Sequence, residues 1–298
     1  MLYDESVNSN LSKAAEVFNT LHGVEAIAEP LSVIGRIIEV KFSGSMCHTC
    51  GVSDYFDDFA SISENMYGIP FAVWEYEAIP GIEPKFLVRI VKLDFLEEIR
   101  EAMKVVGNLV KQRMQEFEET GKCEESLFEE LCFCLLTANY TAEGGIRIQK
   151  TIGHSFCDLE QDELSARLKG LGYRFPTSRA NYIVESRKLH QKLGETLKKY
   201  ANGVEAREWL IENVKGFGYK ESSHFLRNVG FYDVAIIDRH ILRLLKDKEL
   251  ISEIPKTLNK KRYIRIEKLL SAIASKLEIG LGEMDLYLWY MKTGKVLK

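Results

Sequence analysis

The sequence predicts two parts: an α+β segment over residues 1–95, then a mainly α-helical domain over residues 96–298. Before residue 95 there are runs rich in Val, Ile and aromatic residues, which are typical of strands. After residue 94, apolar residues recur every three or four positions, as in amphipathic helices. The charge changes at the same place, because residues 1–95 contain 6 Lys+Arg and 14 Asp+Glu whereas the remainder contains 34 and 30.

Length and composition limit the class of protein. A chain of 298 residues with 46% hydrophobic content can bury a core and has room for about two domains. No apolar run approaches the roughly 18 residues of a membrane span, and the first residues lack a signal-peptide pattern. We therefore expect a soluble intracellular protein with no membrane partner. The scattered cysteines suggest reduced thiols and not a disulfide framework.

Four elements are expected in the first part. An opening helix is predicted near residues 11–21, and strands are predicted over residues 31–42, 71–77 and 86–93. Pro or Gly bounds these segments, which is typical of strands. We expect three or more antiparallel strands. The role of residues 1–95 does not follow from the sequence.

Cys47 and Cys50 in this part have the spacing of a metal or redox pair. Only one such pair exists, so a tetrahedral zinc would need His48, another residue or a second chain. A plain turn with two thiols is the alternative, and we predict no metal site.

One helix start is marked in the second part. Residues 126–129, Ser-Leu-Phe-Glu, have the pattern of a capping box and precede the apolar run LCFCLL. A buried helix is therefore predicted to begin there and to end near residues 137–139.

A glycine hairpin lies between two predicted helices, residues 204–214 and 220–229. The connecting Gly216-Phe217-Gly218 can adopt positive φ angles, so that backbone N–H groups converge on a phosphate oxygen near a helix N-terminus. An ordinary helical corner with a glycine C-cap is the alternative.

Lys220 is expected in the first turn of the second helix, where the partial positive charge of the helix disfavours a cation. The same charge favours the neutral amine, which is a nucleophile able to form a Schiff base. A solvated lysine that contacts phosphate is the alternative.

Asp238 follows an apolar run and precedes a predicted helix over residues 241–246. It could simply be the N-cap of that helix. A carboxylate held by such a cap could also assist proton transfer or stabilise positive charge on a sugar, and the two roles are compatible.

These motifs together resemble a known family. The run GFGYKESSHFLRN followed by AIIDRHI is similar to the helix-hairpin-helix DNA glycosylase superfamily, and specifically to the second family of 8-oxoguanine DNA glycosylase/AP lyases. The segments 129–148, 170–185 and 284–298 agree, so the resemblance covers residues 96–298. It implies two helical lobes with an active site between them, and an enzyme that removes 8-oxoguanine from double-stranded DNA and cleaves the abasic site by β-elimination.

The resemblance also implies roles for single residues. Lys220 and Asp238 would be catalytic. Four residues would surround the flipped base: Phe175, Asp285, Trp289 and Lys298. Their alternatives are a core aromatic for Phe175 and Trp289, a helix cap for Asp285 and a frayed terminus for Lys298. Contacts to the DNA backbone or to the gap left by the base would come from Gly216, Gly218 and Asn139.

No cofactor is expected to be required. Some members of the superfamily carry a four-cysteine iron–sulfur cluster near the C-terminus, but no cysteine follows Cys157 here, which excludes that cluster. A monovalent cation bound by carbonyls of residues 215–218 stays open. The alternative functions are a glycosylase for another damaged base and a non-catalytic helix-hairpin-helix protein. Protein partners are not predicted.

Overall fold

The computed structural model describes residues 5–48 and 51–298, and it divides into two compact units. The first unit joins the described residues up to Arg100 with residues 242–278. The second unit joins residues 101–241 with residues 279–298. The units are divided near residue 100, and residues 242–278 group with the N-terminal segment. The expected division into domains 1–95 and 96–298 stays a prediction.

The first unit contains a four-stranded antiparallel sheet in the order β1-β2-β4-β3. Its strands are β1 (Ile27–Ile34), β2 (Ile37–Ser43), β3 (Phe71–Ile79) and β4 (Lys85–Lys92). The prediction of one strand over residues 31–42 was wrong. Gly35, with φ of +59°, makes a turn there, so the apolar run forms both arms of a hairpin.

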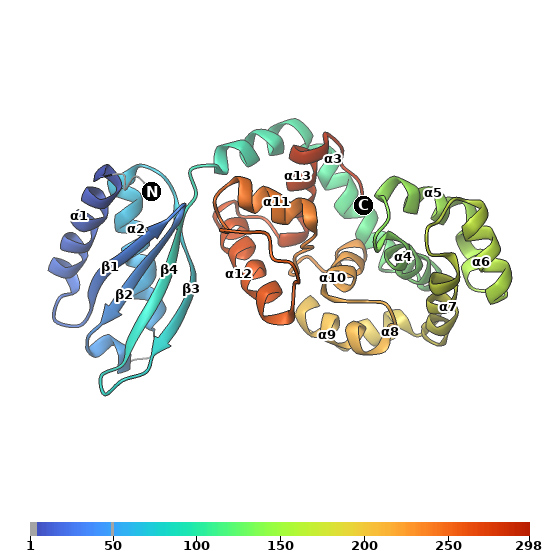
Figure 1. The fold of residues 1–298 in the computed structure, drawn as a ribbon, viewed down its shortest axis with the longest axis horizontal. Helices are drawn as coiled ribbons and strands as arrows, with labels where there is room; N and C mark the ends of the chain where they lie inside the picture. The colour runs from blue at the N-terminus through green and yellow to red at the C-terminus, as the bar shows by residue number, and fades with distance from the viewer. Residues whose placement is uncertain (1–4, 49–50) are drawn as a thin grey trace. The chain divides into compact units, whose positions relative to one another are not determined.

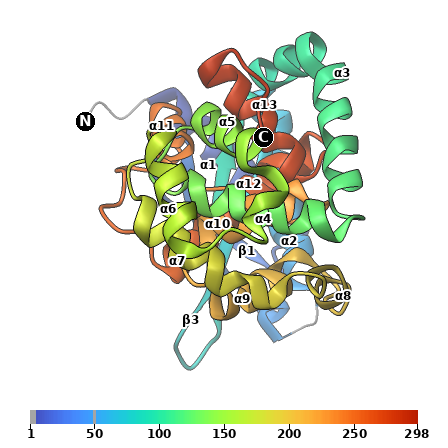
Figure 2. The same ribbon diagram turned by 90° about the vertical axis from the view of Figure 1, so that its right-hand side faces the viewer.

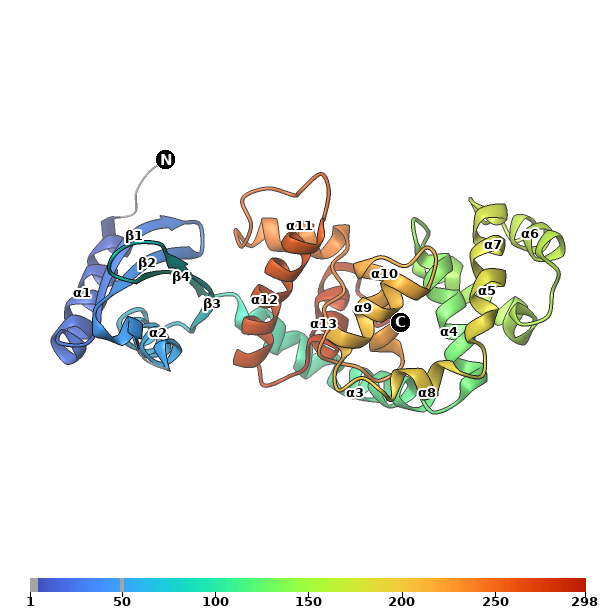
Figure 3. The same cartoon turned by 90° about the horizontal axis from the view of Figure 1, so that it is seen from below.

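Helices α1 (Glu5–His22) and α2 (Val52–Tyr67) pack against the sheet (Figures 1 and 3). Aromatic side chains fill the core between these layers, and Phe18, Phe42 and Phe59 meet edge to face at 5.6 to 5.7 Å. Helix α12 (Lys260–Lys276) contacts β3, where the Trp74 indole donates a hydrogen bond to the Arg265 carbonyl at 3.0 Å. This contact explains why residues 242–278 group with the N-terminal segment.

The rest of the described chain is helical. Its longer elements are α3 (Leu96–Thr120), α4 (Glu124–Thr137), α5 (Ala142–Ile152), α6 (Gln161–Gly170), α7 (Pro176–Ser186), α8 (Leu193–Leu197), α9 (Gly203–Asn213), α10 (Tyr219–Asn228), α11 (Arg239–Asp247) and α13 (Leu281–Thr293). Among the described helices, none is long and apolar enough to cross a membrane.

Helix α4 is the central element of the second unit, where it contacts α5, α7, α8 and α10 (Figure 2). Its residues from Leu127 to Thr137 are buried except for the half-buried Glu129. The predicted capping box was wrong, because α4 begins at Glu124 and Ser126 lies within it. Two glutamates in the first turn favour the earlier start through the helix dipole, and Glu124 Oε1 accepts the Gly194 N–H at 2.9 Å.

Candidate active site

The hairpin lies between α9 and α10, as predicted. Gly216 has φ of +94°, and a Cβ there would lie 2.5 Å from Cδ2 of the Tyr182 ring, so both conformation and packing require glycine. Gly218 differs, because its φ of −116° is extended and it serves as the N-cap of α10. Of the two glycines, Gly216 has the expected positive φ and Gly218 does not.

Helix α7 supports the hairpin. Lys215 Nζ lies 2.8 Å from Glu185 Oε1 and 5.6 Å from the centre of the Tyr182 ring. Phe217 is buried against Phe225, with ring centres 6.1 Å apart. Gly216 is exposed, so its backbone faces solvent, where a phosphate could approach.

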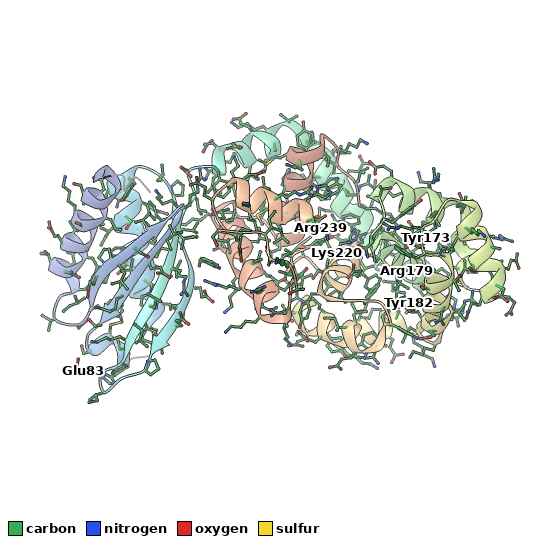
Figure 4. The ribbon with its side chains drawn as sticks, in the orientation of Figure 1. Glu83, Tyr173, Arg179, Tyr182, Lys220 and Arg239 are labelled. Carbon is green, nitrogen blue, oxygen red and sulfur yellow. The ribbon has the colours of Figure 1, made fainter. Side chains whose placement is uncertain are left out.

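Lys220 is half-buried in the first turn of α10 and lines a cavity of about 340 Å³. Figure 4 marks Lys220 together with Arg239, the residue that follows Asp238. The wall comes from the end of α4 and the start of α5, from α10, from the segment before α11, and from α13 and the residues after it. Every lining residue belongs to the second unit.

Asp238 lines the same cavity and caps α11. Its Oδ1 accepts the backbone N–H of His240 at 2.7 Å and that of Ile241 at 2.9 Å. The predicted N-cap is confirmed, and it fixes the carboxylate in the cavity wall that also contains Lys220.

Asp285 and Trp289 lie one turn apart on α13 and both line the cavity. Burial raises the pKa of Asp285 to about 6, although Arg227, with its Nη1 3.4 Å away, acts in the opposite direction. The Trp289 ring meets His240 edge-on at 5.1 Å. Within the described residues, no partner accepts a hydrogen bond from the buried Trp289 Nε1.

Lys298 lines the cavity, but its ammonium group is anchored elsewhere. Nζ lies 2.5 Å from Glu130 Oε2 and 2.5 Å from Gln149 Oε1, and 4.4 Å from the centre of the Phe133 ring. A side chain with these contacts is not a frayed one.

Besides the hairpin glycines Gly216 and Gly218, two further predicted site residues are absent from the cavity wall. Phe175 is the N-cap of α7, is 39% exposed and lies beside the Arg174 guanidinium at 5.0 Å. Asn139 is exposed after the end of α4 with φ of +61°. Its neighbour Tyr140 does line the cavity and packs on Tyr173 at 4.7 Å. Both roles stay predictions.

The sequence interpretation missed several members of the cavity wall, among them His224 and Arg227. They lie one and two turns after Lys220 on α10, and this helical spacing is the signal that could have found them. Burial lowers the pKa of His224 well below its usual range, and the charges of Arg227 and Lys220 lower it further. The ring beside the lysine is therefore neutral near pH 7.

The cavity thus combines two lysine side chains, three carboxyl groups and a guanidinium in a partly desolvated space. An amine in such a place can attack an electrophilic carbon, and a fixed carboxylate can stabilise the positive charge that develops there. No group of three or more His, Cys, Asp or Glu side chains in residues 5–48 and 51–298 is placed to hold a metal ion. Cys50 lies outside the described residues, so its pairing with Cys47 stays untested.

The family model described as 8-oxoguanine DNA glycosylase matches residues 110–279, which include both Lys220 and Asp238. The chain belongs to the 8-oxoguanine DNA glycosylase family. A curated relative from Methanocaldococcus jannaschii, named 8-oxoguanine DNA glycosylase/AP lyase, is 50% identical over 204 residues, which are 68% of this chain and 97% of the relative. One of the same name from Korarchaeum cryptofilum is 51% identical over 193 residues, 65% of this chain and 92% of the relative.

Solved structures of this glycosylase family agree. The M. jannaschii enzyme in complex with a 15mer DNA containing 8-oxoguanine matches with a TM-score of 0.67 and 50% identity, over 68% of this chain and 99% of that one. The Thermotoga maritima 8-oxoguanine DNA glycosylase matches with a TM-score of 0.66 and 48% identity, over 69% and 99%. These relatives match almost completely and leave about a third of this chain without a counterpart.

Proposed function

We propose that this protein is a bifunctional 8-oxoguanine DNA N-glycosylase and abasic-site lyase. One observation carries the proposal: in a member of this family, Lys220 and a rigidly capped Asp238 line the same cavity. Its volume of about 340 Å³ lies within the range of roughly 300–1,000 Å³ that is usual for small-ligand sites.

The reaction begins when the amine of Lys220 attacks C1′ of the damaged nucleotide. The bond from C1′ to the base breaks, and the base leaves with its electron pair and takes up a proton. Asp238 stabilises the positive charge on the sugar. Opening of the sugar ring gives a Schiff base between Lys220 and C1′, and loss of a proton from C2′ then expels the 3′ phosphate.

The remaining residues bind the substrate. Trp289 offers an aromatic face to the flipped base, and Asp285 and Lys298 contribute polar groups beside it. Phe175 would stack on the base from an element outside the described cavity wall. Gly216 and Gly218 present backbone N–H groups to phosphate, and Asn139 would enter the gap in the duplex.

The chemistry of this mechanism uses only side chains, so no cofactor is required. A monovalent cation held by carbonyls of residues 215–218 would strengthen phosphate binding without a part in bond breaking. We place the enzyme inside the cell, where its double-stranded DNA substrate lies.

Borohydride trapping tests the proposal. Wild-type protein with a duplex that carries one 8-oxoguanine should give a covalent adduct when the Schiff base is reduced, and Lys220→Gln should give none. Lys215→Gln is the matched control, because Lys215 is an exposed lysine of the same hairpin, outside the cavity wall. Absence of an adduct with wild type, or its persistence with Lys220→Gln, would refute the lysine mechanism.

A further inference from the structure

Glu130 is a buried acid of α4 that the mechanism above does not use. Its residue exposure is only 3%, yet both of its carboxylate oxygens accept hydrogen bonds. Oε2 accepts from Lys298 Nζ at 2.5 Å and from Gln149 Nε2 at 3.1 Å, and Oε1 accepts from Asn228 Nδ2 at 2.5 Å. Side chains from α4, α5, α10 and residue 298 thus meet at one carboxylate.

Such a group is costly to bury unless every polar atom is satisfied. Glu130, Gln149 and Asn228 are not part of the cavity wall, so they form a layer behind it. Only Lys298 belongs both to this layer and to the wall. The layer is therefore connected to the base-binding space through that residue.

The contacts of Lys298 decide what it can offer a ligand. Its ammonium has two oxygen partners and lies over the Phe133 ring, and the side chain is 19% exposed. The backbone of Lys298 accepts a hydrogen bond from the His224 ring, and this bond raises the pKa of that ring, although burial lowers it more strongly. The side chain of Lys298 thus acts as an anchor, and its placement decides what residues 297 and 298 present to the cavity.

A second ion pair holds the same segment, but weakly. Lys295 Nζ lies 3.0 Å from Glu143 Oε1, and the two side chains are 58% and 57% exposed. Exposed pairs contribute little because water screens them, so the buried pair is the stronger constraint. Figures 1 and 2 both show the C-terminal end beside α5, the helix that carries Gln149 and Glu143.

We propose that Glu130 is a positioning residue for lesion recognition: its carboxylate holds Lys298, and Lys298 in turn sets the wall against which the damaged base is bound. Glu130 does not touch the substrate. The inference rests on the proposed function and extends it from the residues that contact the base to one that places them.

Two activities separate this role from general support of the fold. Release of 8-oxoguanine needs the base-binding wall, whereas cleavage at a pre-made abasic site needs Lys220 but no base. Glu130→Gln keeps the shape of the side chain and removes its charge. We expect single-turnover base release to fall about 10- to 100-fold, which corresponds to roughly 1.4–2.7 kcal/mol of transition-state stabilisation. Abasic-site cleavage and trapping there should change less than about threefold.

Lys295→Gln is the matched control, because Lys295 itself lies outside the cavity wall and its exposed pair with Glu143, a residue of the wall, tethers the same segment. Both of its activities should stay within about twofold of wild type. If Glu130→Gln does not fold, Glu130→Asp serves instead, since it keeps the charge and draws the carboxylate back by one methylene. We expect Glu130→Asp to melt near the wild-type temperature and to lose about three- to tenfold in base release alone.

Equal losses in base release and abasic-site cleavage would overturn the proposal and make Glu130 a purely structural residue. Wild-type base release in both folded variants would overturn it as well. Failure of the proposed function would look different, because wild-type protein itself would then neither release the base nor cleave the abasic site.

Discussion

Arg89 in the sheet of the first unit and Arg227 in α10 of the second unit are both largely buried, but their surroundings differ. Arg89 donates through Nε to Glu39, through Nη1 to Glu75 and through Nη2 to Glu77, at 3.0 to 3.1 Å. Nη1 of Arg227 lies 3.4 Å from Asp285, and its guanidinium carbon lies 4.8 Å from the centre of the Phe117 ring. No atom in the described part of the chain accepts a hydrogen bond from its Nε or Nη1.

The difference separates a structural site from a functional one. Arg89 lines the larger cavity, of about 780 Å³, whereas Arg227 lines the one of about 340 Å³. By volume alone, the cavity beside Arg89 would be the better candidate for a functional site. A guanidinium whose three nitrogens all donate to carboxylates has few donors left for a ligand. Buried donors without partners are costly and call for an explanation such as binding. The unpaired donors of Arg227 therefore favour the cavity beside it as the functional site.

Among the substitutions that test this comparison, Asp238→Asn is expected to slow base release the most. Asparagine also caps helices well, so the fold and duplex binding should persist, with affinity within about threefold. Loss of the negative charge should slow base release roughly 10²- to 10³-fold, measured in single turnover beside a binding titration by anisotropy.

Asp233→Asn is the control, because Asp233 accepts the Gly203 N–H at 2.9 and 3.0 Å and lies outside the cavity wall. It should leave the rate of base release unchanged. Parallel loss of binding and base release in Asp238→Asn would show that Asp238 chiefly supports the fold.

Replacement of each arginine by methionine tests the contrast directly. Arg89→Met should lower the free energy of unfolding by about 1–3 kcal/mol, because Glu39, Glu75 and Glu77 each lose a hydrogen bond, although Glu75 keeps its pair with Arg265. It should not change base release per folded molecule. Arg227→Met should slow base release about tenfold in addition to its effect on stability. Urea unfolding and active-site titration give both quantities. An activity loss confined to Arg89→Met would reverse our assignment of the two cavities.

The sequence predicts the hairpin and its two catalytic candidates because that information is local. Gly216, Lys220 and Asp238 lie in one segment whose helix starts and caps are set by neighbouring residues. Asp285 and Trp289 came only from the family resemblance, since nothing in α13 distinguishes a cavity wall from a core helix. Only tertiary contacts show whether such a helix lines a cavity or packs in a core.

Other features depend on residues far apart in the chain. The contact between Glu130 and Lys298 joins two distant elements, and no pattern in either one predicts it. The turn at Gly35 lies within a stretch rich in Ile and Val that we interpreted as one strand. Likewise, grouping of residues 242–278 with the first unit follows from the packing of α12 on β3, which periodicity does not reveal.

The smallest expected effect concerns pH. Because burial raises the pKa of Asp285 from 3.8 to about 6, the folded protein keeps this proton to higher pH than the unfolded chain does. The free energy of unfolding of wild type, relative to Asp285→Asn, should therefore fall as pH rises from about 4 to about 6 and should be constant above that window. Chemical denaturation at a series of pH values measures this difference. If the free energies of unfolding of the two proteins change in parallel with pH, the pKa of Asp285 is an ordinary one.

The central claim is that the amine of Lys220 forms the bond to the sugar. The most direct measurement is the identity of the lysine that carries the reduced adduct after borohydride trapping, obtained by digestion and mass spectrometry of the cross-linked peptide. We predict that the modified residue is Lys220, within the peptide that contains the start of α10. A stable adduct on Lys215, Lys298 or the N-terminal amine, with Lys220 unmodified, would contradict the account.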